Sequence, residues 1–174
     1  MYQRKRVLAV IPARGGSKRI HRKNIRLLNG RPLIAYSIQS ALQSSYIDKL
    51  VVSTDDEEIA EVARNFGAEV PFIRPDELAG DKVQDGPVLR HTLRFYEGHN
   101  VQFDYIVYLR PTSPMRSTVD IEDGLSLAVS HNFQLVRSVT IVEGTMHPYW
   151  MYIGKNKTLK PLIDGIDVNK YYQS

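Results

Sequence analysis

The sequence has no cysteine among its 174 residues. This absence excludes disulfides, zinc sites built from thiolates and thiol nucleophiles, and it agrees with a protein that needs no oxidising compartment. The sequence also lacks an apolar run long enough to cross a bilayer, although 43% of its residues are hydrophobic. We therefore expect a soluble, cytoplasmic protein that makes no membrane contact and has enough residues for one sizeable core.

Acidic residues are missing from the first part of the chain. Residues 1–47 hold ten Lys/Arg and no Asp or Glu, whereas residues 48–174 hold thirteen Lys/Arg and nineteen acids, so +10 and −6 give the net +4. Such a basic segment predicts a polyanionic partner. We do not expect nucleic acid, because no interleaved aromatics or known nucleic-acid module accompany the charge. A triphosphate together with a carboxylated sugar would need the same cations.

Residues 6–24, RVLAVIPARGGSKRIHRKN, contain a strand that leads into a basic loop. The unbroken apolar run at residues 7–11 is typical of a parallel strand covered on both faces, and Pro12 ends it. Open α/β sheets bind ligands at the carboxyl ends of their strands. The loop there offers glycines for close approach of a guest and polar or cationic donors, namely Arg14, Gly15, Gly16, Ser17, Lys18, Arg22 and Lys23.

Two glycines after a strand can also form a simple tight turn. The loop matches neither the spaced-glycine dinucleotide fingerprint nor the P-loop pattern, which disfavours a Rossmann dehydrogenase and a P-loop NTPase. The density of donors at one strand end favours an anion-binding loop over a plain turn.

Four stretches together resemble the acylneuraminate cytidylyltransferases. They are IPARGGSK followed by RKN, VSTDDEEIAEVARNFGAEVPFIRP from Val52, LRPTSPMR from Leu109, and HPYWM from His147. They occur in the family's order over nearly the whole chain. The family activates nonulosonic and ulosonic acid sugars, such as sialic acid, by coupling them to CMP. The resemblance therefore implies a cytidylyltransferase whose substrates are CTP and a keto-sugar acid.

The pattern of apolar residues and capping signals predicts alternating strands and helices. We expect further strands at residues 49–53, 70–73, 104–109 and 134–142. We expect helices that begin at Pro32, at a capping box of Thr54 and Glu57, at Pro87 and at Ser117. The expected fold is a three-layer α/β/α domain with a mainly parallel sheet of about five or more strands. The resemblance implies the Rossmann-like fold of nucleotide-diphospho-sugar transferases.

The resemblance and the basic residues together predict the site. Arg14 and Lys18 should be catalytic because they neutralise the triphosphate. The residues expected to bind the nucleotide are Arg14, Gly15, Gly16, Ser17, Lys18, Lys23, Asn24 and Arg74. Those expected to face the sugar are Arg110, Thr112, Ser113 and Arg116.

Alternative roles stay open at several positions. Thr112 and Ser113 could serve turn chemistry alone, and Asp55 and Asp56 could be acids favoured by a helix dipole or groups near the nucleotide. The chain also departs from the family's pattern. The four residues after Asp81, KVQD, lack the usual serine or threonine, and an arginine stands at position 110 where sialic-acid enzymes often carry glutamine. The sugar is therefore left open.

The resemblance further implies Mg²⁺ bound by a paired-aspartate segment that lies beyond residue 174, so the metal ligands are unknown here. Asp55, Asp56 and Asp85 are other available acids. We expect residues 1–174 to form one nucleotidyltransferase domain, incomplete at its C-terminus, with residues 143–174 in a dimerisation arm of a homodimer. Alternative functions are coupling of 3-deoxy-manno-octulosonate, use of GTP, or an inactive nucleotide-binding subunit.

Overall fold

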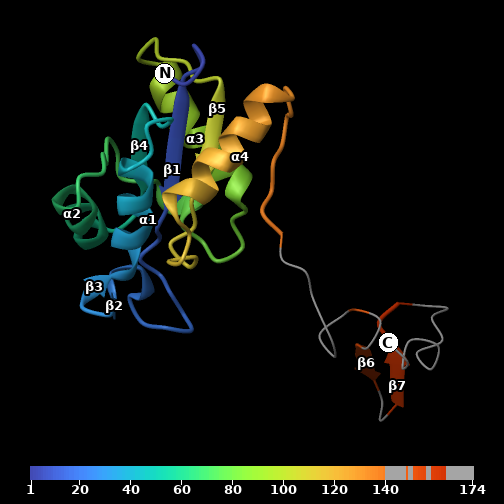
Figure 1. Ribbon diagram of the computed structural model, residues 1–174. Helices are drawn as coiled ribbons and strands as arrows, with labels where there is room; N and C mark the ends of the chain where they lie inside the picture. Colours follow the sequence, from blue (N-terminus) through green and yellow to red (C-terminus); the bar gives the residue numbers. More distant parts are fainter. Residues whose placement is uncertain (140–147, 149–150, 156–157, 164–174) are drawn as a thin grey trace. The chain divides into compact units, whose positions relative to one another are not determined.

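A parallel sheet forms the centre of the computed structural model, which describes residues 1–139, 148, 151–155 and 158–163. Strand β1 (Val7–Pro12) lies between β4 (Lys49–Ser53) and β5 (Tyr105–Tyr108), in the order β4-β1-β5 (Figure 1). In this register Val10 lies opposite Val51 on one side and Tyr108 on the other. Because β1 is paired along both edges and covered on both faces, it is the unbroken apolar strand that the sequence predicts.

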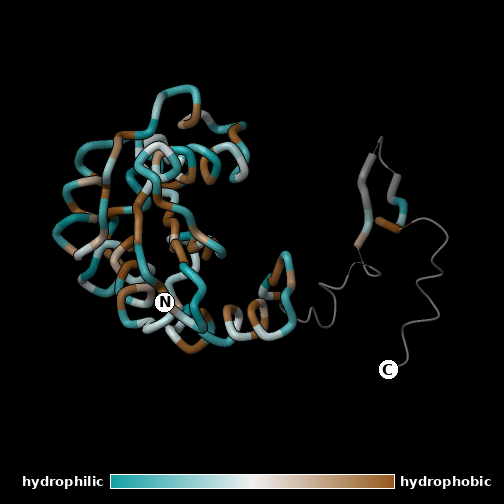
Figure 2. The backbone as a smooth tube through the Cα atoms, turned by 90° about the horizontal axis from the view of Figure 1, so that it is seen from above, coloured by the Kyte–Doolittle hydropathy of each residue, from teal (hydrophilic) through white to brown (hydrophobic). Residues whose placement is uncertain are grey.

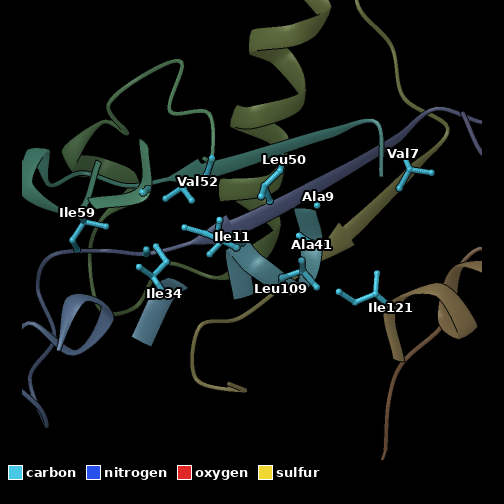
Figure 3. Close-up of a cluster of buried hydrophobic side chains, with 14 of the residues drawn as sticks. Val7, Ala9, Ile11, Ile34, Ala41, Leu50, Val52, Ile59, Leu109 and Ile121 are labelled. Atoms are coloured by element: carbon cyan, nitrogen blue, oxygen red, sulfur yellow. The ribbon is translucent and has the colours of Figure 1, made fainter. Parts of the chain in front are cut away.

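Helices cover both faces of this sheet. On one face lie α1 (Leu33–Leu42), α2 (Glu57–Asn65) and α4 (Thr118–Ser130), and on the other lies α3 (Asp85–Glu97) (Figure 1). Successive side chains of β1 point to opposite faces of the sheet. The side chains that pack under α1, α2 and α4 include Val7, Ala9, Ile11, Ile34, Leu50, Val52, Ile59 and Ile121 (Figure 3). On the other face, Leu8, Val10 and Val51 pack against Tyr96 of α3. The predicted α/β/α class is confirmed.

Helix α2 begins differently from the prediction. Its N-cap is Asp56, whose side chain accepts a hydrogen bond from the Ile59 amide at 3.0 Å, so the expected capping box of Thr54 and Glu57 is wrong. The Thr54 hydroxyl instead accepts from the Asp56 amide at 3.1 Å, inside the core. Two other helices follow the sequence more closely. The capping box of Ser117 and Asp120 is present, and α3 begins two residues before Pro87.

The sheet is smaller than predicted within the described residues, with three strands in place of five or more. Residues 70–73 form no strand, and this edge segment pairs only through single parallel bridges, Glu69 with Val51 and Ile73 with Thr54. Residues 134–139 form no strand either, and the remainder of the strand predicted to end at residue 142 lies outside the described part. The apolar residues that alternate in this segment are not packed against a core, since Leu135 is 74% exposed and Val139 is 85% exposed.

Short elements complete the description. They are the 3₁₀ turns η1 (Lys23–Ile25) and η2 (Asp76–Leu78), the hairpin of β2 (Leu27–Leu28) with β3 (Arg31–Pro32), and the antiparallel pair of β6 (Tyr152–Lys155) with β7 (Thr158–Pro161). The chain divides into two compact units, Met1–Val136 and Arg137–Ser174. Most of the expected arm at residues 143–174 lies outside the described residues, so the domain and arm assignments stay predictions.

The first unit follows the usual distribution of hydropathy. Hydrophobic stretches run through its interior, whereas hydrophilic stretches follow its outer loops (Figure 2). Within the described ranges, no helix combines the length and the apolar character needed to span a membrane.

Candidate active site

A cavity of about 350 Å³ lies at the carboxyl ends of β1 and β5. The chain leaves β1 toward β4 on one side, whereas β5 pairs with the other side of β1. This is the point at which the strand order reverses, where open α/β sheets hold their ligands. The fold therefore places the cavity where the sequence predicts a site.

The cavity brings together residues that are far apart in the sequence. The predicted site residues that line it are Arg14, Ser17, Lys23, Asn24, Arg74, Arg110 and Thr112. Gly15, Gly16, Lys18, Ser113 and Arg116 are not among its lining residues. The residues expected for the nucleotide and those expected for the sugar thus meet around one space, and their individual roles stay predictions.

The loop after β1 is fixed by side chains on its inner side. The buried amide of Asn24 donates to the Arg14 carbonyl at 2.9 Å, and the Gly15 amide donates to the Asp55 carboxylate at 3.1 Å. The Ala13 amide continues the β1 ladder with a hydrogen bond to the Ser53 carbonyl at 2.9 Å. These bonds anchor the two ends of the loop, at residues 13–15 and at Asn24.

The structure gives a reason for a glycine at position 15 that the sequence does not reveal. A Cβ at this position would lie 2.6 Å from the Asp56 Oδ2 atom, so the loop approaches the start of α2 as closely as a glycine allows. Gly16 has open space around it. A side chain at position 15 would therefore force the Asp56 carboxylate to shift, independently of any guest.

Arg22 does not join the cavity, contrary to its expected place among the donors of the loop. Its guanidinium donates to Asp56 at 3.0 Å and pairs with Glu58 at 2.7 Å. Both acids belong to the start of α2, where negative charge is favourable. Arg22 thus holds the loop against that helix.

Arg74 is the most unusual cation of the site, because only 4% of its side chain is exposed. Its Nη2 donates to Asp55 Oδ1 at 3.3 Å, while its buried Nε has no hydrogen-bond partner in the part of the chain that the structure describes. Burial lowers the pKa of Arg74, and the Asp55 carboxylate opposes that shift. Buried donors in folded proteins are rarely left unpaired. The unpaired Nε is itself closed off from solvent, while other atoms of Arg74 line the cavity.

Asp81 links the two residues predicted to be catalytic. Its Oδ1 lies 2.8 Å from Arg14 Nη1, and its Oδ2 pairs with the Lys18 ammonium. The Lys18 hydrogen bond, followed by the charges of both cations, lowers the pKa of Asp81. A carboxylate and a phosphate present similar oxygens to a guanidinium. Asp81 therefore occupies the position at which the two cations would hold an anion.

Asp85 joins α3 to the end of β5. It accepts a hydrogen bond from the Tyr108 hydroxyl at 2.5 Å and pairs with the Arg110 guanidinium. Burial raises the pKa of Asp85, but these two donors outweigh it, so the net shift is downward. Burial and the Asp85 charge raise the pKa of Tyr108 to about 12. Arg110 stays 60% exposed and is thus held at the mouth of the cavity.

Ser113 and Arg116 shape the turn that follows β5. The Ser113 amide donates to the Arg110 carbonyl at 3.2 Å, and Arg116 Nη2 donates to the same carbonyl at 3.0 Å. Burial lowers the pKa of Arg116, whose Nη1 has no partner within the described segments. The two residues fix the backbone from which the Arg110 side chain projects.

Comparison with known proteins agrees with this geometry. Residues 8–93 match the family model described as Cytidylyltransferase. The chain belongs to the cytidylyltransferase family.

Two relatives show how far the likeness extends. A CMP-N,N'-diacetyllegionaminic acid synthase of Legionella pneumophila is 41% identical over 145 residues, which cover 83% of this chain and 61% of that protein. A pseudaminic acid cytidylyltransferase of Campylobacter jejuni is 45% identical over 108 residues, or 62% of this chain and 47% of that protein. The chain therefore spans about half to three fifths of the length of these relatives.

Among solved structures, a CMP:2-keto-3-deoxy-manno-octonic acid synthetase complexed with CTP is similar to this chain. It has a TM-score of 0.62 and 26% identity over 73% of this chain and 48% of that one. The nucleotide-diphospho-sugar transferase-like fold is thereby confirmed for this member of the family.

The residues that the structure describes do not fit a magnesium site. Among them, no group of three or more His, Cys, Asp or Glu side chains lies close enough to hold a metal ion. The two carboxylates that line the cavity are paired with cations, Asp81 with Arg14 and Lys18, and Asp85 with Arg110. Mg²⁺ prefers carboxylate oxygens and waters in an octahedral arrangement, which these ion pairs do not offer.

The sequence assigns no role to Asp81 and leaves that of Asp55 open between a helix acid and a group near the nucleotide. In the structure the Asp55 carboxylate accepts from Gly15 in the loop and from the buried Arg74. The signal for Asp55 in the sequence is its position, because it follows β4 at the same sheet edge at which the basic loop follows β1.

Proposed function

We propose that this chain carries the nucleotide site of an enzyme that couples CTP to an acidic keto-sugar and releases pyrophosphate. The acceptor would be sialic, legionaminic or a related nonulosonic acid. The observation that carries the proposal is the cavity at the ends of β1 and β5, in which Arg14 and Arg74 meet Arg110 and Thr112. The names of the two relatives, a legionaminic acid synthase and a pseudaminic acid cytidylyltransferase, support the same class of acceptor.

In this reaction the anomeric hydroxyl oxygen of the sugar attacks the α-phosphorus of CTP. A bond forms between that oxygen and phosphorus, the bond to pyrophosphate breaks, and the hydroxyl proton leaves. The protein has little covalent chemistry to perform, so positioning and charge neutralisation dominate. Arg14 and Lys18 neutralise the phosphates, and Lys23 assists. Because Asp81 pairs with Arg14 and Lys18, the triphosphate has to displace its carboxylate.

The other polar and cationic residues of the cavity are divided between the two substrates. Arg74 and Asn24, which both line the cavity, serve the nucleoside side. Arg110 and Thr112 serve the sugar carboxylate, which a guanidinium can bind through two parallel hydrogen bonds.

The test measures pyrophosphate release with each of the four nucleoside triphosphates and a panel of keto-sugar acids. We expect release with CTP and a nonulosonic acid, and none when either substrate is omitted. Tight CTP binding without turnover for every acceptor would instead favour a nucleotide-binding subunit.

A second acceptor, 3-deoxy-manno-octulosonate, is favoured by the structural likeness to the octonic acid synthetase with CTP. It leaves the nucleotide side unchanged and alters only the acceptor. The same panel separates the two, because the preferred acceptor gives the higher kcat/KM. Release with GTP in place of CTP would contradict both.

The predicted homodimer and the Mg²⁺ requirement belong to the same proposal. In the second unit, Met151 is 38% exposed and Tyr152 is 49% exposed, and both residue types are enriched at interface cores. Sedimentation at micromolar concentration should show a dimer, and a strictly monomeric species would contradict it.

The Mg²⁺ requirement is tested by adding EDTA, and turnover insensitive to EDTA would contradict it.

A further inference from the structure

We propose that Asp55 is a positioning residue that couples the loop after β1 to Arg74, an inference that rests on the proposed nucleotide site. A single oxygen, Asp55 Oδ1, accepts both the Gly15 amide at 3.1 Å and Arg74 Nη2 at 3.3 Å. The loop belongs to the phosphate side of the cavity, and Arg74 belongs to the nucleoside side. One carboxylate thereby sets the distance between the two halves of the nucleotide site.

The backbone places Asp55 where three segments meet. Thr54, just before it, is fully buried at the end of β4 and forms a parallel bridge with Ile73. The Arg74 amide donates to the Thr54 carbonyl at 2.7 Å, so Arg74 is held through its backbone and again through its side chain. The Asp55 side chain then reaches the loop that leaves the adjacent strand, β1.

The neighbouring acid cannot take over this task. Asp56 is occupied by the amide of Ile59 in α2 and by the Arg22 guanidinium. It also limits the loop on its other side, since a Cβ on Gly15 would lie 2.6 Å from its Oδ2. Asp55 holds Gly15 by a hydrogen bond, while Asp56 blocks its movement toward α2. The two consecutive acids together define the position of the loop.

The burial of Arg74 makes the pairing with Asp55 important. Asp55 is its one salt-bridge partner within the described residues, and nearby Arg14 disfavours its charge. A buried charge that loses its partner is strongly destabilised and relaxes toward water. Without the Asp55 carboxylate, the Arg74 guanidinium would leave its place beside the cavity. We infer that Asp55 acts on the nucleoside through Arg74 and on the phosphates through Gly15.

The test compares Asp55→Ala, Asp55→Asn, Arg74→Ala and the double variant Asp55→Ala/Arg74→Ala with the wild type. Three ligands, CTP, CMP and inorganic pyrophosphate, are titrated by calorimetry, and exchange of the Gly15 amide hydrogen is followed by NMR without ligand. The matched control is Asp104→Ala, since Asp104 also accepts one backbone amide, that of Arg6 at 2.8 Å, and one cation, Lys5 at 3.1 Å. Asp104 lies at the opposite end of the sheet, before β5.

In Asp55→Ala we expect Gly15 exchange to rise by at least about tenfold, because the amide loses its acceptor. CMP affinity should fall by about tenfold, but by less than about twofold when Arg74 is already alanine, since coupled residues are not additive. Asp55→Asn keeps an oxygen for Gly15 and removes the charge that Arg74 needs. It should restore slow exchange without restoring CMP affinity. Asp104→Ala should change neither quantity.

Two results would overturn the inference. One is a wild-type exchange rate for Gly15 in Asp55→Ala, and the other is an equal loss of CMP affinity with and without Arg74. If Asp55→Ala does not fold, Asp55→Asn decides through its separation of exchange from CMP affinity. If the wild type binds none of the three ligands, the proposed function fails, while the Gly15 exchange still decides whether Asp55 holds the loop.

Discussion

The two ends of the central sheet use the same chemical groups for different purposes. At the amino ends, Asp48 accepts the Val7 amide at 2.8 Å, and Asp104 accepts the Arg6 amide at 2.8 Å. Each acid also meets one cation, the chain's amino terminus for Asp48 and Lys5 for Asp104. At the carboxyl ends, Asp55 likewise joins one backbone amide, that of Gly15, to one cation, Arg74.

The difference lies in what remains after these pairs are made. At the amino ends the side chains of Met1 and Lys5 are 60% and 45% exposed, so water completes the hydrogen bonding of the cations there. At the carboxyl ends Arg74 is buried and lines a cavity. A carboxylate that joins one backbone amide to one cation thus stabilises the fold at the amino ends of the sheet. At the carboxyl ends the same arrangement lies beside the candidate binding site.

The largest expected effect comes from removing a cation of the cavity. Arg14→Ala should weaken CTP affinity by about 10- to 150-fold, because a charge-assisted hydrogen bond is worth roughly 1.5–3 kcal/mol. Lys18→Ala should also weaken it, but less, since the Lys18 side chain is 79% exposed and screened by water. Calorimetry with CTP measures both.

Lys5→Ala is the control for this pair, because Lys5 makes the corresponding ion pair at the amino ends. It should leave CTP affinity unchanged, and all three variants should keep the wild-type circular dichroism spectrum. Unchanged CTP affinity in both Arg14→Ala and Lys18→Ala would show that the loop after β1 does not bind the triphosphate. The cations at the two ends of the sheet would then not differ in ligand binding.

A smaller effect of opposite sign is expected from Asp81. Asp81→Asn removes the charge that competes with phosphate for Arg14 and Lys18, so the affinity for pyrophosphate should rise several-fold. Asp76→Asn, a change on the nearby turn η2, provides the charge-matched control. A loss of affinity in Asp81→Asn would mean that Asp81 supports the bound anion rather than competing with it.

The smallest effect concerns the amino ends and the pH. The Arg6 amide and Lys5 lower the pKa of Asp104 below its ordinary 3.8. A carboxylate with a lowered folded-state pKa stabilises the protein above its unfolded pKa and loses that contribution as the pH falls through the folded one. Urea unfolding should therefore show a decline below about pH 4 that is shallower in Asp104→Asn. An identical decline in both proteins would show that Asp104 contributes nothing.

The sequence predicts local features of the fold better than long-range pairing. The buried run of β1, the strand at residues 49–53 and the capping box at Ser117 depend on neighbouring residues, and the structure has all three. The predicted strands at residues 70–73 and 134–142 needed partners that a pattern of alternation cannot supply, and the described residues form neither.

The same distinction applies to the site. Basic residues in a loop after a strand identify Arg14 and Lys23 as candidates, and the structure places both at the cavity. The ion pair of Asp81 with Arg14 joins residues 67 positions apart, and that of Asp55 with Arg74 joins residues 19 positions apart. No local pattern encodes them, since an acid in a loop and an acid before a helix look alike in sequence whether or not a cation faces them.

The carboxylate of Asp81 also has a consequence for the behaviour of the site in salt. An empty cluster of cations would gather anions from solution, and a polyphosphate would have to expel them, so its affinity would fall steeply with ionic strength. Here Arg14 and Lys18 already hold an anion that belongs to the chain itself. Salt weakens this internal counterion and the incoming phosphate alike, and the two losses partly cancel. Binding would thus replace the Asp81 carboxylate by a phosphate of the ligand, and the affinity for that ligand would change little with the salt concentration.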